Sequence, residues 1–85
     1  MKKDLEKIIN ILWGLNNKDR GDFLKVLFTE REIKEFSNRI EILTDLKNGE
    51  TQRVISKKLG ISVTTVTRGN KHYQKNKELI DKYLI

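Results

Sequence analysis

The sequence predicts an all-α protein of six helices. Its 85 residues include no proline and only five glycines, so few positions interrupt a helix. Apolar residues recur three and four positions apart over most of the chain, which is the spacing of one helical face. Residues 52–71 also have the pattern of two short helices joined by a tight turn. Because no linker, repeat or low-complexity tract interrupts the chain, we expect a single domain over residues 1–85.

The first two predicted helices precede residue 29. Residues 3–15 form an amphipathic helix, which Asn16 and Asn17 end, and a second helix runs from about Lys18 to Phe28. The apolar residues of the first helix are Leu5, Ile8, Ile9, Leu12, Trp13 and Leu15. Those of the second are Phe23, Leu24, Leu27 and Phe28.

A long helix is expected to begin at a capping box. In Thr29-Glu30-Arg31-Glu32, the hydroxyl of the threonine accepts the amide of the last residue, whose carboxylate accepts the amide of the threonine. Asn48-Gly49 ends this helix. Its inward residues are predicted to be Ile33, Phe36, Ile40, Leu43 and Leu46. A last amphipathic helix covers residues 76–85, with the apolar residues Leu79, Ile80, Tyr83 and Leu84.

Residues 52–71 are predicted to form a helix-turn-helix. Gly60 suits the turn because a residue without a Cβ ends a helix in the left-handed conformation without strain. Ser62 is expected to cap the second helix. That recognition helix, Val63–Asn70, carries short hydrogen-bonding side chains and cations. The residues that would pack the two helices together are Val54, Ile55, Leu59, Ile61, Val63 and Val66.

A plain helical hairpin is the alternative interpretation of this segment, with Gly60 as no more than a C-cap. The absence of an acidic residue between Arg53 and Lys77 favours DNA binding. The net charge of +6 also suits a polyanionic partner, although basicity does not separate DNA from RNA.

Composition excludes several classes of protein. With no cysteine the chain has no thiolate metal site, and His72 as its single histidine leaves little for zinc binding. No carboxylate pair or activated nucleophile is evident, so we expect no catalytic residue and no enzyme. No apolar run is long enough for a membrane span or a signal sequence, so we expect a cytoplasmic protein.

The chain is expected to form a homodimer. A core of this size, in a chain that is 36% hydrophobic, is marginal in isolation. The first and last predicted helices carry apolar stripes that one chain has little means to cover. A helix-turn-helix protein also gains specificity by binding two half-sites about 34 Å apart. We therefore expect residues 1–49 to form a dimerisation core that holds two helix-turn-helix units.

Four groups of residues, in order between about Val26 and Tyr73, point to a family. They are Phe28-Thr29-Glu30-Arg31-Glu32, Asn38-Arg39, Gly49-Glu50 and Thr65-Val66-Thr67-Arg68-Gly69. With them the chain resembles the bacterial tryptophan operon repressor family. The resemblance implies an intertwined dimer of six-helix chains. It also implies sequence-specific repression at a double-stranded DNA operator, with L-tryptophan as corepressor between the core and the recognition helix.

The resemblance further implies which residues hold the ligand. Thr29 and Arg39 match positions at its carboxylate end, and Arg68 and Gly69 match positions that flank its indole ring. Ten positions separate Thr29 from Arg39, or about 15 Å along one helix, which is too far for one small ligand. The pocket closes only if Thr29 comes from one chain and Arg39 with Arg68 from the other.

The ligand's amino group meets a different set of positions. The backbone carbonyls of Val26 and Phe28 match the positions that receive it. His72 stands where the family has a small hydroxyl residue, so a protonated His72 would repel an ammonium group and select against an amino acid.

Several of these residues have a simpler interpretation. Thr29 is already explained as a cap, and Arg39 could pair with Glu35 on a solvated face. Arg68 could clamp a phosphate, and His72 could be a polar residue that closes a helix.

The expected DNA contacts surround the helix-turn-helix. The positions that match contacts in the family are Gln52, Arg53, Ser62, Val63, Thr64, Thr65 and Thr67. The lysines around this motif are Lys57, Lys58, Lys71, Lys75 and Lys77, among which we expect Lys57 and Lys71 to contact phosphates. Two departures from the family concern this region. Gly69-Asn70-Lys71 replaces Gly-Ser-Asn, and the segment from Gly49 to Gln52 is one residue short.

The sequence therefore predicts a homodimeric DNA-binding repressor with L-tryptophan or a related small molecule as effector. One alternative is a ligand-independent DNA-binding regulator of the same superfamily, which Asn70 and His72 favour. The other is a helical interaction protein that no longer binds DNA.

Overall fold

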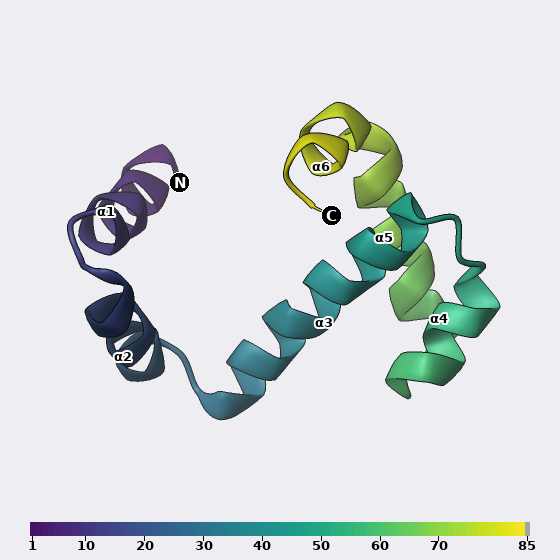
Figure 1. Ribbon diagram of the computed structural model, residues 1–85, viewed down its shortest axis with the longest axis horizontal. Helices are drawn as coiled ribbons and strands as arrows, with labels where there is room; N and C mark the ends of the chain where they lie inside the picture. Colours follow the sequence, from purple (N-terminus) through teal and green to yellow (C-terminus); the bar gives the residue numbers. More distant parts are fainter. Residues whose placement is uncertain (85) are drawn as a thin grey trace. The chain divides into compact units, whose positions relative to one another are not determined.

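The computed structural model describes residues 1–84, and every regular element in that range is a helix (Figure 1). The six helices are α1 (Lys2–Trp13), α2 (Asn17–Leu27), α3 (Glu30–Lys47), α4 (Gln52–Leu59), α5 (Val63–Lys75) and α6 (Lys77–Tyr83). The predicted all-α, six-helix chain is confirmed. The chain divides into two compact units, the first covering residues 1–33 and the second beginning at Lys34.

In the first unit, Arg20 ties α2 to the end of α1. Its Nε donates to the carbonyl oxygen of Leu12 at 2.8 Å, and its Nη2 donates to that of Leu15 at 2.7 Å. The side chain of Asn16 caps α2 by accepting the amide of Asp19 at 2.8 Å. The bounds of both helices differ slightly from the predicted ones. The first helix ends at residue 13 and not at residue 15, and the second begins at residue 17 and not at residue 18.

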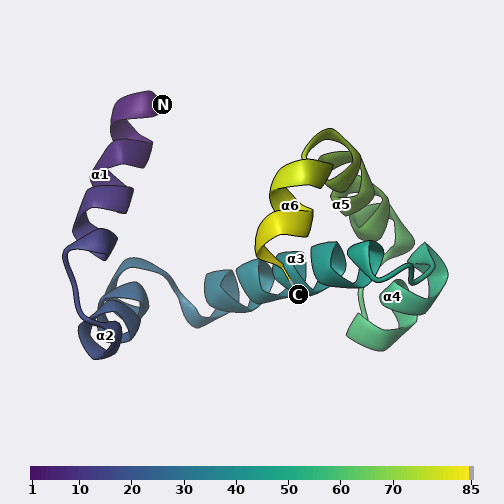
Figure 2. The ribbon, with the colours of Figure 1, turned by 45° about the horizontal axis from the view of Figure 1, so that its top comes forward.

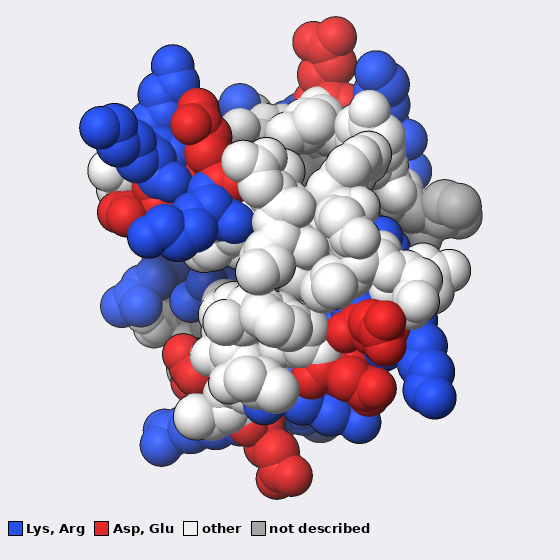
Figure 3. Space-filling model, turned by 90° about the vertical axis from the view of Figure 1, so that its left-hand side faces the viewer, with Lys and Arg blue, Asp and Glu red and all other residues white. Residues whose placement is uncertain are grey.

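The first unit has no buried core of its own. Neither α1 nor α2 contains a buried residue. Along α1 the side chains of Leu5, Ile9 and Trp13 are all exposed. Figure 3 looks at the face nearest these two helices, where uncharged side chains fill the middle and charged ones lie around them. The predicted apolar stripe is present, and one chain leaves it uncovered.

The capping box forms as predicted. The amide of Thr29 donates to Oε1 of Glu32 at 2.9 Å, and the amide of Glu32 donates to Oγ1 of Thr29 at 3.1 Å. The hydrogen bond from the backbone of Thr29, followed by the one from its side chain, lowers the pKa of the Glu32 carboxyl group. At the other end of α3, Gly49 has a φ of 85°, as a glycine after a helix terminus often does.

The core of the second unit lies where α3, α4 and α5 meet. Ile42, Ile55 and Val66 are buried together, one from each helix. The half-buried residues packed against them are Leu46, Leu59 and Ile61. Figure 2 shows α4 and α5 beside the end of α3, with α6 following α5.

Of the predicted inward residues of α3, Leu43 and Leu46 are half-buried and Leu46 packs against this core, but the prediction is wrong for the other three in a single chain. Ile33, Phe36 and Ile40 are 37%, 39% and 53% exposed. The buried residues of α3 are instead Ile42 and Asp45. Helical spacing identifies an apolar stripe but does not say what covers it, and the helix-turn-helix packs on a different side of α3. Val54 and Val63, predicted to pack within the helix-turn-helix, are also exposed.

Three hydrogen bonds and one buried side chain hold α6. Tyr73 of α5 donates its hydroxyl to Oδ1 of Asp81 at 3.0 Å. Nζ of Lys47, at the end of α3, donates to the carbonyl oxygens of Asp81 and Leu84. Ile80 is buried beneath them. The last turn of α6 is therefore anchored to both α3 and α5.

None of the helices within residues 1–84 is long and apolar enough to cross a lipid bilayer.

Candidate nucleic-acid interface and ligand pocket

The turn between α4 and α5 has the predicted conformation. Gly60 has a φ of 66° and a ψ of 36°, which is the left-handed region. The side chain of Ser62 accepts the amide of Thr65 at 3.1 Å and so caps α5. The hydroxyl of Ser56 donates to the carbonyl oxygen of Ile61, a contact that bridges the turn. These local bonds fix the angle at which α5 leaves the turn.

A further cap was not predicted. The side chain of Thr51 accepts the amide of Val54 at 3.2 Å and begins α4. The signal for it was present in the sequence, because a threonine directly before a helical apolar pattern is a typical N-cap. The segment before Gln52 therefore starts α4 with a satisfied amide.

The predicted DNA-contact residues lie on the surface of α4, the turn and α5. Seven of the nine are exposed, namely Arg53, Lys57, Ser62, Val63, Thr64, Thr65 and Lys71. The other two, Gln52 and Thr67, are half-buried because they contact each other: the Thr67 hydroxyl donates to Oε1 of Gln52 at 2.8 Å. This bond links the two helices of the motif at their surface.

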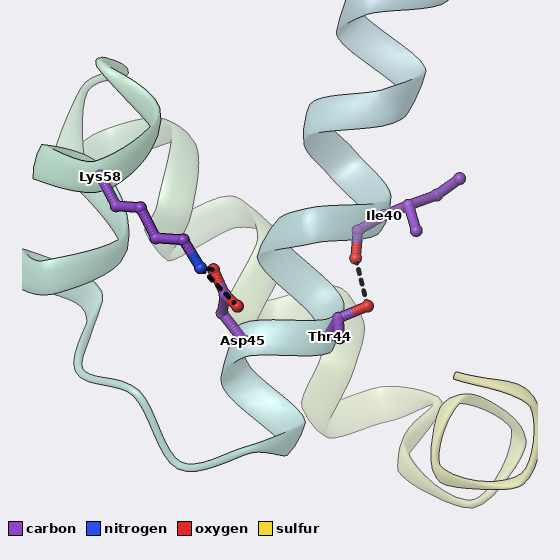
Figure 4. Close-up of polar contacts among 4 residues, drawn as sticks. All are labelled: Ile40, Thr44, Asp45 and Lys58. Atoms are coloured by element: carbon purple, nitrogen blue, oxygen red, sulfur yellow. Dashed lines mark hydrogen bonds and ion pairs between the residues drawn. The ribbon is translucent and has the colours of Figure 1, made fainter. Parts of the chain in front are cut away.

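An ion pair attaches α4 to α3. Nζ of Lys58 lies 3.2 Å from Oδ2 of Asp45, whose side chain is only 8% exposed (Figure 4). A buried carboxylate needs such a partner, since an unpaired charge is costly to remove from water. Lys58 is one of the five lysines named around the motif. It is held within the fold by this ion pair, a structural role that was not predicted from the sequence.

A pocket of about 530 Å³ lies between α3, α5 and α6 of the second unit. Three of its lining residues are cationic or can become so: Arg39, Arg68 and His72. The apolar part of the lining is formed by Ile42, Leu43, Leu79 and Ile80. Thr65, Gly69 and Asn76 complete it, and no acidic residue is among the ten. The site thus combines an apolar wall with positive charge.

The structure brings together four of the seven predicted ligand residues. Arg39 comes from α3, whereas Arg68, Gly69 and His72 share one face of α5. The other three, Val26, Phe28 and Thr29, belong to the first unit. Four further lining residues were not predicted from the sequence to contact the ligand: Ile42 and Leu43 of α3, and Leu79 and Ile80 of α6. Thr65, predicted to contact DNA, also lines the pocket.

The guanidinium group of Arg39 has a neighbour on its own helix. Its Cζ lies 5.6 Å from the centroid of the Phe36 ring, within the range of a cation–π contact. Arg39 is exposed, so this contact orients the side chain at the pocket without removing it from solvent.

Gly69 is required by the packing of α5 on α3. A Cβ at this position would lie 2.6 Å from Cγ2 of Ile42, closer than two carbon atoms can approach. The resemblance implies that Gly69 flanks an indole ring. The structure gives a reason for glycine that involves no ligand: only a glycine allows α5 to lie this close to α3.

Comparison with known proteins gives one consistent family. The profile described as Trp repressor protein matches residues 3–84. A Trp operon repressor homolog of Vibrio campbellii is 34% identical over 70 residues, covering 80% of this chain and 70% of the relative. One from Xylella fastidiosa is 34% identical over 73 residues, covering 84% and 79%. One from Photobacterium profundum is 36% identical over 67 residues, covering 76% and 65%. No solved structure gave a significant match.

These matches extend through nearly all of the helices described above. The family is one of transcription regulators and not of enzymes. From the six-helix fold, the helix-turn-helix and the match over residues 3–84, the chain belongs to the Trp repressor family.

Proposed function

We propose that this repressor-family protein is a homodimer that binds a DNA operator sequence-specifically and binds it more tightly in the presence of L-tryptophan. The observation that carries the proposal is the double role of α5. One stripe of this helix, with Thr65, Arg68 and His72, lines the pocket, and another, with Thr64 and Lys71, lies exposed on the outside. A ligand in the pocket therefore touches the helix that would enter the major groove.

The exposed stripe suits DNA. Short hydroxyl side chains such as Thr64 can reach base edges, and Arg53, Lys57 and Lys71 can neutralise phosphates. No acidic residue interrupts the sequence from Arg53 to Lys77. An association that depends on these cations would weaken steeply as the salt concentration rises.

The pocket suits the carboxylate and the ring of tryptophan. Arg39 can form a charge-assisted, two-point hydrogen-bonded pair with a carboxylate. An indole ring beside Arg68 would add a cation–π contact of about 0.5–2 kcal/mol. The apolar lining residues would cover the rest of the ring. In the proposed dimer, Val26, Phe28 and Thr29 of the other chain would close the site.

The ligand can raise the affinity for operator only by its differential affinity for the DNA-competent arrangement of the two recognition helices. By linkage, operator must then raise the affinity for tryptophan by the same factor. The DNA partner also implies that the protein acts in the cytoplasm.

Operator titrations with and without L-tryptophan test the proposal. Wild-type protein should bind its operator more tightly with the ligand, and Arg39→Ala should lose this response while keeping the weak, ligand-free binding. Arg39→Lys keeps the charge but not the planar fork, so it should retain part of the response. Identical wild-type curves with and without tryptophan would contradict the corepressor role and leave a DNA-binding dimer.

A ligand-independent DNA-binding regulator is the second candidate. The observation in its favour is that His72 lines the pocket, at a position where the resemblance implies a small hydroxyl residue.

A further inference from the structure

We infer that Lys47 is a positioning residue for the ligand pocket, because it holds the last turn of α6 against α3 and so keeps in place the wall that α6 gives to the pocket. The inference rests on the proposed function and concerns a residue that lies outside the lining. It arises from two features of α6: this short helix forms part of the pocket wall, and bonds from other helices hold it.

The seven residues of α6 give this helix little stability of its own. An isolated helix shorter than about 12–15 residues is marginal in water. The residue before it, Asn76, has a φ of −126° and a ψ of 29° and interrupts the path from α5. Its side chain serves α5, since Nδ2 donates to the carbonyl oxygen of His72 at 2.9 Å. Within residues 1–84, the start of α6 therefore has no side-chain cap, and the helix depends on contacts with other elements.

Lys47 acts as a cap at the other end of α6. The last carbonyl groups of a helix have no partner within it, and a cation is favourable beside them. Nζ of Lys47 donates to the carbonyl oxygen of Asp81 at 3.2 Å and to that of Leu84, from 34 and 37 positions earlier in the chain. Figure 2 shows the end of α6 beside α3. Because Tyr73 holds the carboxylate of the same Asp81, this turn is bound to α3 by its backbone and to α5 by a side chain.

The anchored turn carries the pocket wall. Leu79 and Ile80 line the pocket and directly precede Asp81. Ile80 is buried, whereas Leu79 is 60% exposed, so a ligand ring can still cover much of its surface. If the last turn of α6 left α3, both side chains would leave the lining. A ligand that needs this wall binds only the docked form of α6, so its apparent affinity scales with the docked fraction.

The ligand should act on α6 in return. A molecule that binds only the docked form raises the population of that form. L-tryptophan should therefore slow hydrogen exchange at the amides of α6, which report its local opening.

Hydrogen exchange and calorimetry on the full chain test the inference. Lys47→Met keeps the apolar stem of the side chain and removes its donors. In the ligand-free protein, the amide of Leu84, which donates to the carbonyl oxygen of Ile80, should exchange about two- to tenfold faster in this variant. The amide of Ile55, which donates within α4, should keep its wild-type rate. The affinity for L-tryptophan should fall by about two- to tenfold, while ligand-free binding to DNA stays within about twofold.

Two further variants assign the effect to the bonds that Lys47 makes. Lys47→Arg keeps donors at this position and should retain most of the affinity for L-tryptophan. Lys82→Met removes a cation from the last turn of α6 itself, where Nζ lies 5.3 Å from the centroid of the Tyr83 ring. It should leave both the exchange at Leu84 and the affinity within about twofold of wild type, because an exposed cation near a helix end contributes little.

The outcomes separate the inference from the proposed function. If Lys47→Met binds L-tryptophan as tightly as wild type, or speeds exchange at Leu84 and Ile55 equally, the inference is wrong and the corepressor role stands. If wild type binds no L-tryptophan, the corepressor role is wrong. The exchange rates of the ligand-free proteins then decide whether Lys47 holds the wall, and an unchanged rate at Leu84 would overturn the inference.

Discussion

A methyl group added to Gly69 of α5 would lie 2.6 Å from Cγ2 of Ile42 on α3. Ile42 is 2% exposed and belongs to the core of the second unit, so it has little room to move. The missing side chain at Gly69 therefore sets the distance between α3 and α5. The same contact forms part of the pocket wall.

Gly69→Ala should destabilise the protein by about 1–3 kcal/mol, because overpacking outweighs the better helix propensity of alanine. Gly21→Ala is the matched control. A Cβ at Gly21 would meet nothing within 4 Å, so this change should stabilise by about 0.4–1 kcal/mol. Urea unfolding measures both. Adding Ile42→Leu, which removes Cγ2, should restore part of the stability lost in Gly69→Ala, and no restoration would mean that the clash lies elsewhere.

Lys58 and Lys57 should differ in what their loss affects. Lys58→Ala leaves the buried carboxylate of Asp45 without its ion pair, so the free energy of unfolding should fall by about 1–2 kcal/mol. Lys57→Ala should change stability by less than about 0.5 kcal/mol and instead weaken DNA binding and its salt dependence. Chemical denaturation and salt-dependent DNA titrations distinguish the two. Equal effects of both changes on stability would contradict the structural role of Lys58.

The Tyr73 hydroxyl should lose its proton at unusually high pH. Burial, followed by the hydrogen bond and the negative charge of Asp81, raises the pKa of Tyr73 above its usual value of 10.0. The folded state thus favours the neutral phenol. Its contribution to stability is complete below about pH 10 and is lost as the pH rises through the raised pKa. Ultraviolet titration of Tyr83→Phe, which leaves Tyr73 as the only tyrosine, measures it. Asp81→Asn should lower the midpoint only in part, because burial is the largest cause.

The uncovered apolar side chains of α1 should support a dimer. Sedimentation at micromolar concentration should give about 20 kDa, twice the chain mass of 10.0 kDa. Ile9→Lys, which places a charge on the apolar stripe, should weaken the association, whereas Asn10→Lys adds the same charge beside the stripe and should not. A monomeric wild type that still binds a palindromic operator tightly would argue against the dimer.

The sequence was most informative where a structure depends on neighbouring residues. The capping box of Thr29 and Glu32, the left-handed Gly60 and the cap at Ser62 all involve groups within four positions, so their chemistry could be predicted directly. The bounds of α3 and the end of α4 at Gly60 followed from the same signals.

Features that depend on distant residues could not be predicted in this way. A helical pattern of apolar residues does not reveal that Ile42, and not Ile40, faces the helix-turn-helix. The ion pair between Asp45 and Lys58 and the walls that α6 gives to the pocket join residues on separate helices. Only the packed chain brings such residues together.

The hydrogen bond between Thr67 and Gln52 has a consequence for the bases that α4 can recognise. A glutamine amide can both donate and accept, so a free glutamine on this surface would tolerate either kind of base edge. Here Oε1 of Gln52 already accepts the Thr67 hydroxyl, so one of its two acceptor sites is occupied. In the proposed complex, Gln52 would therefore favour donation from Nε2 to an acceptor such as N7 or O6 of guanine over acceptance from the amino group of cytosine. The hydrogen bond between Thr67 and Gln52 forms within the free protein, and it would bias the choice of base that Gln52 contacts in the operator.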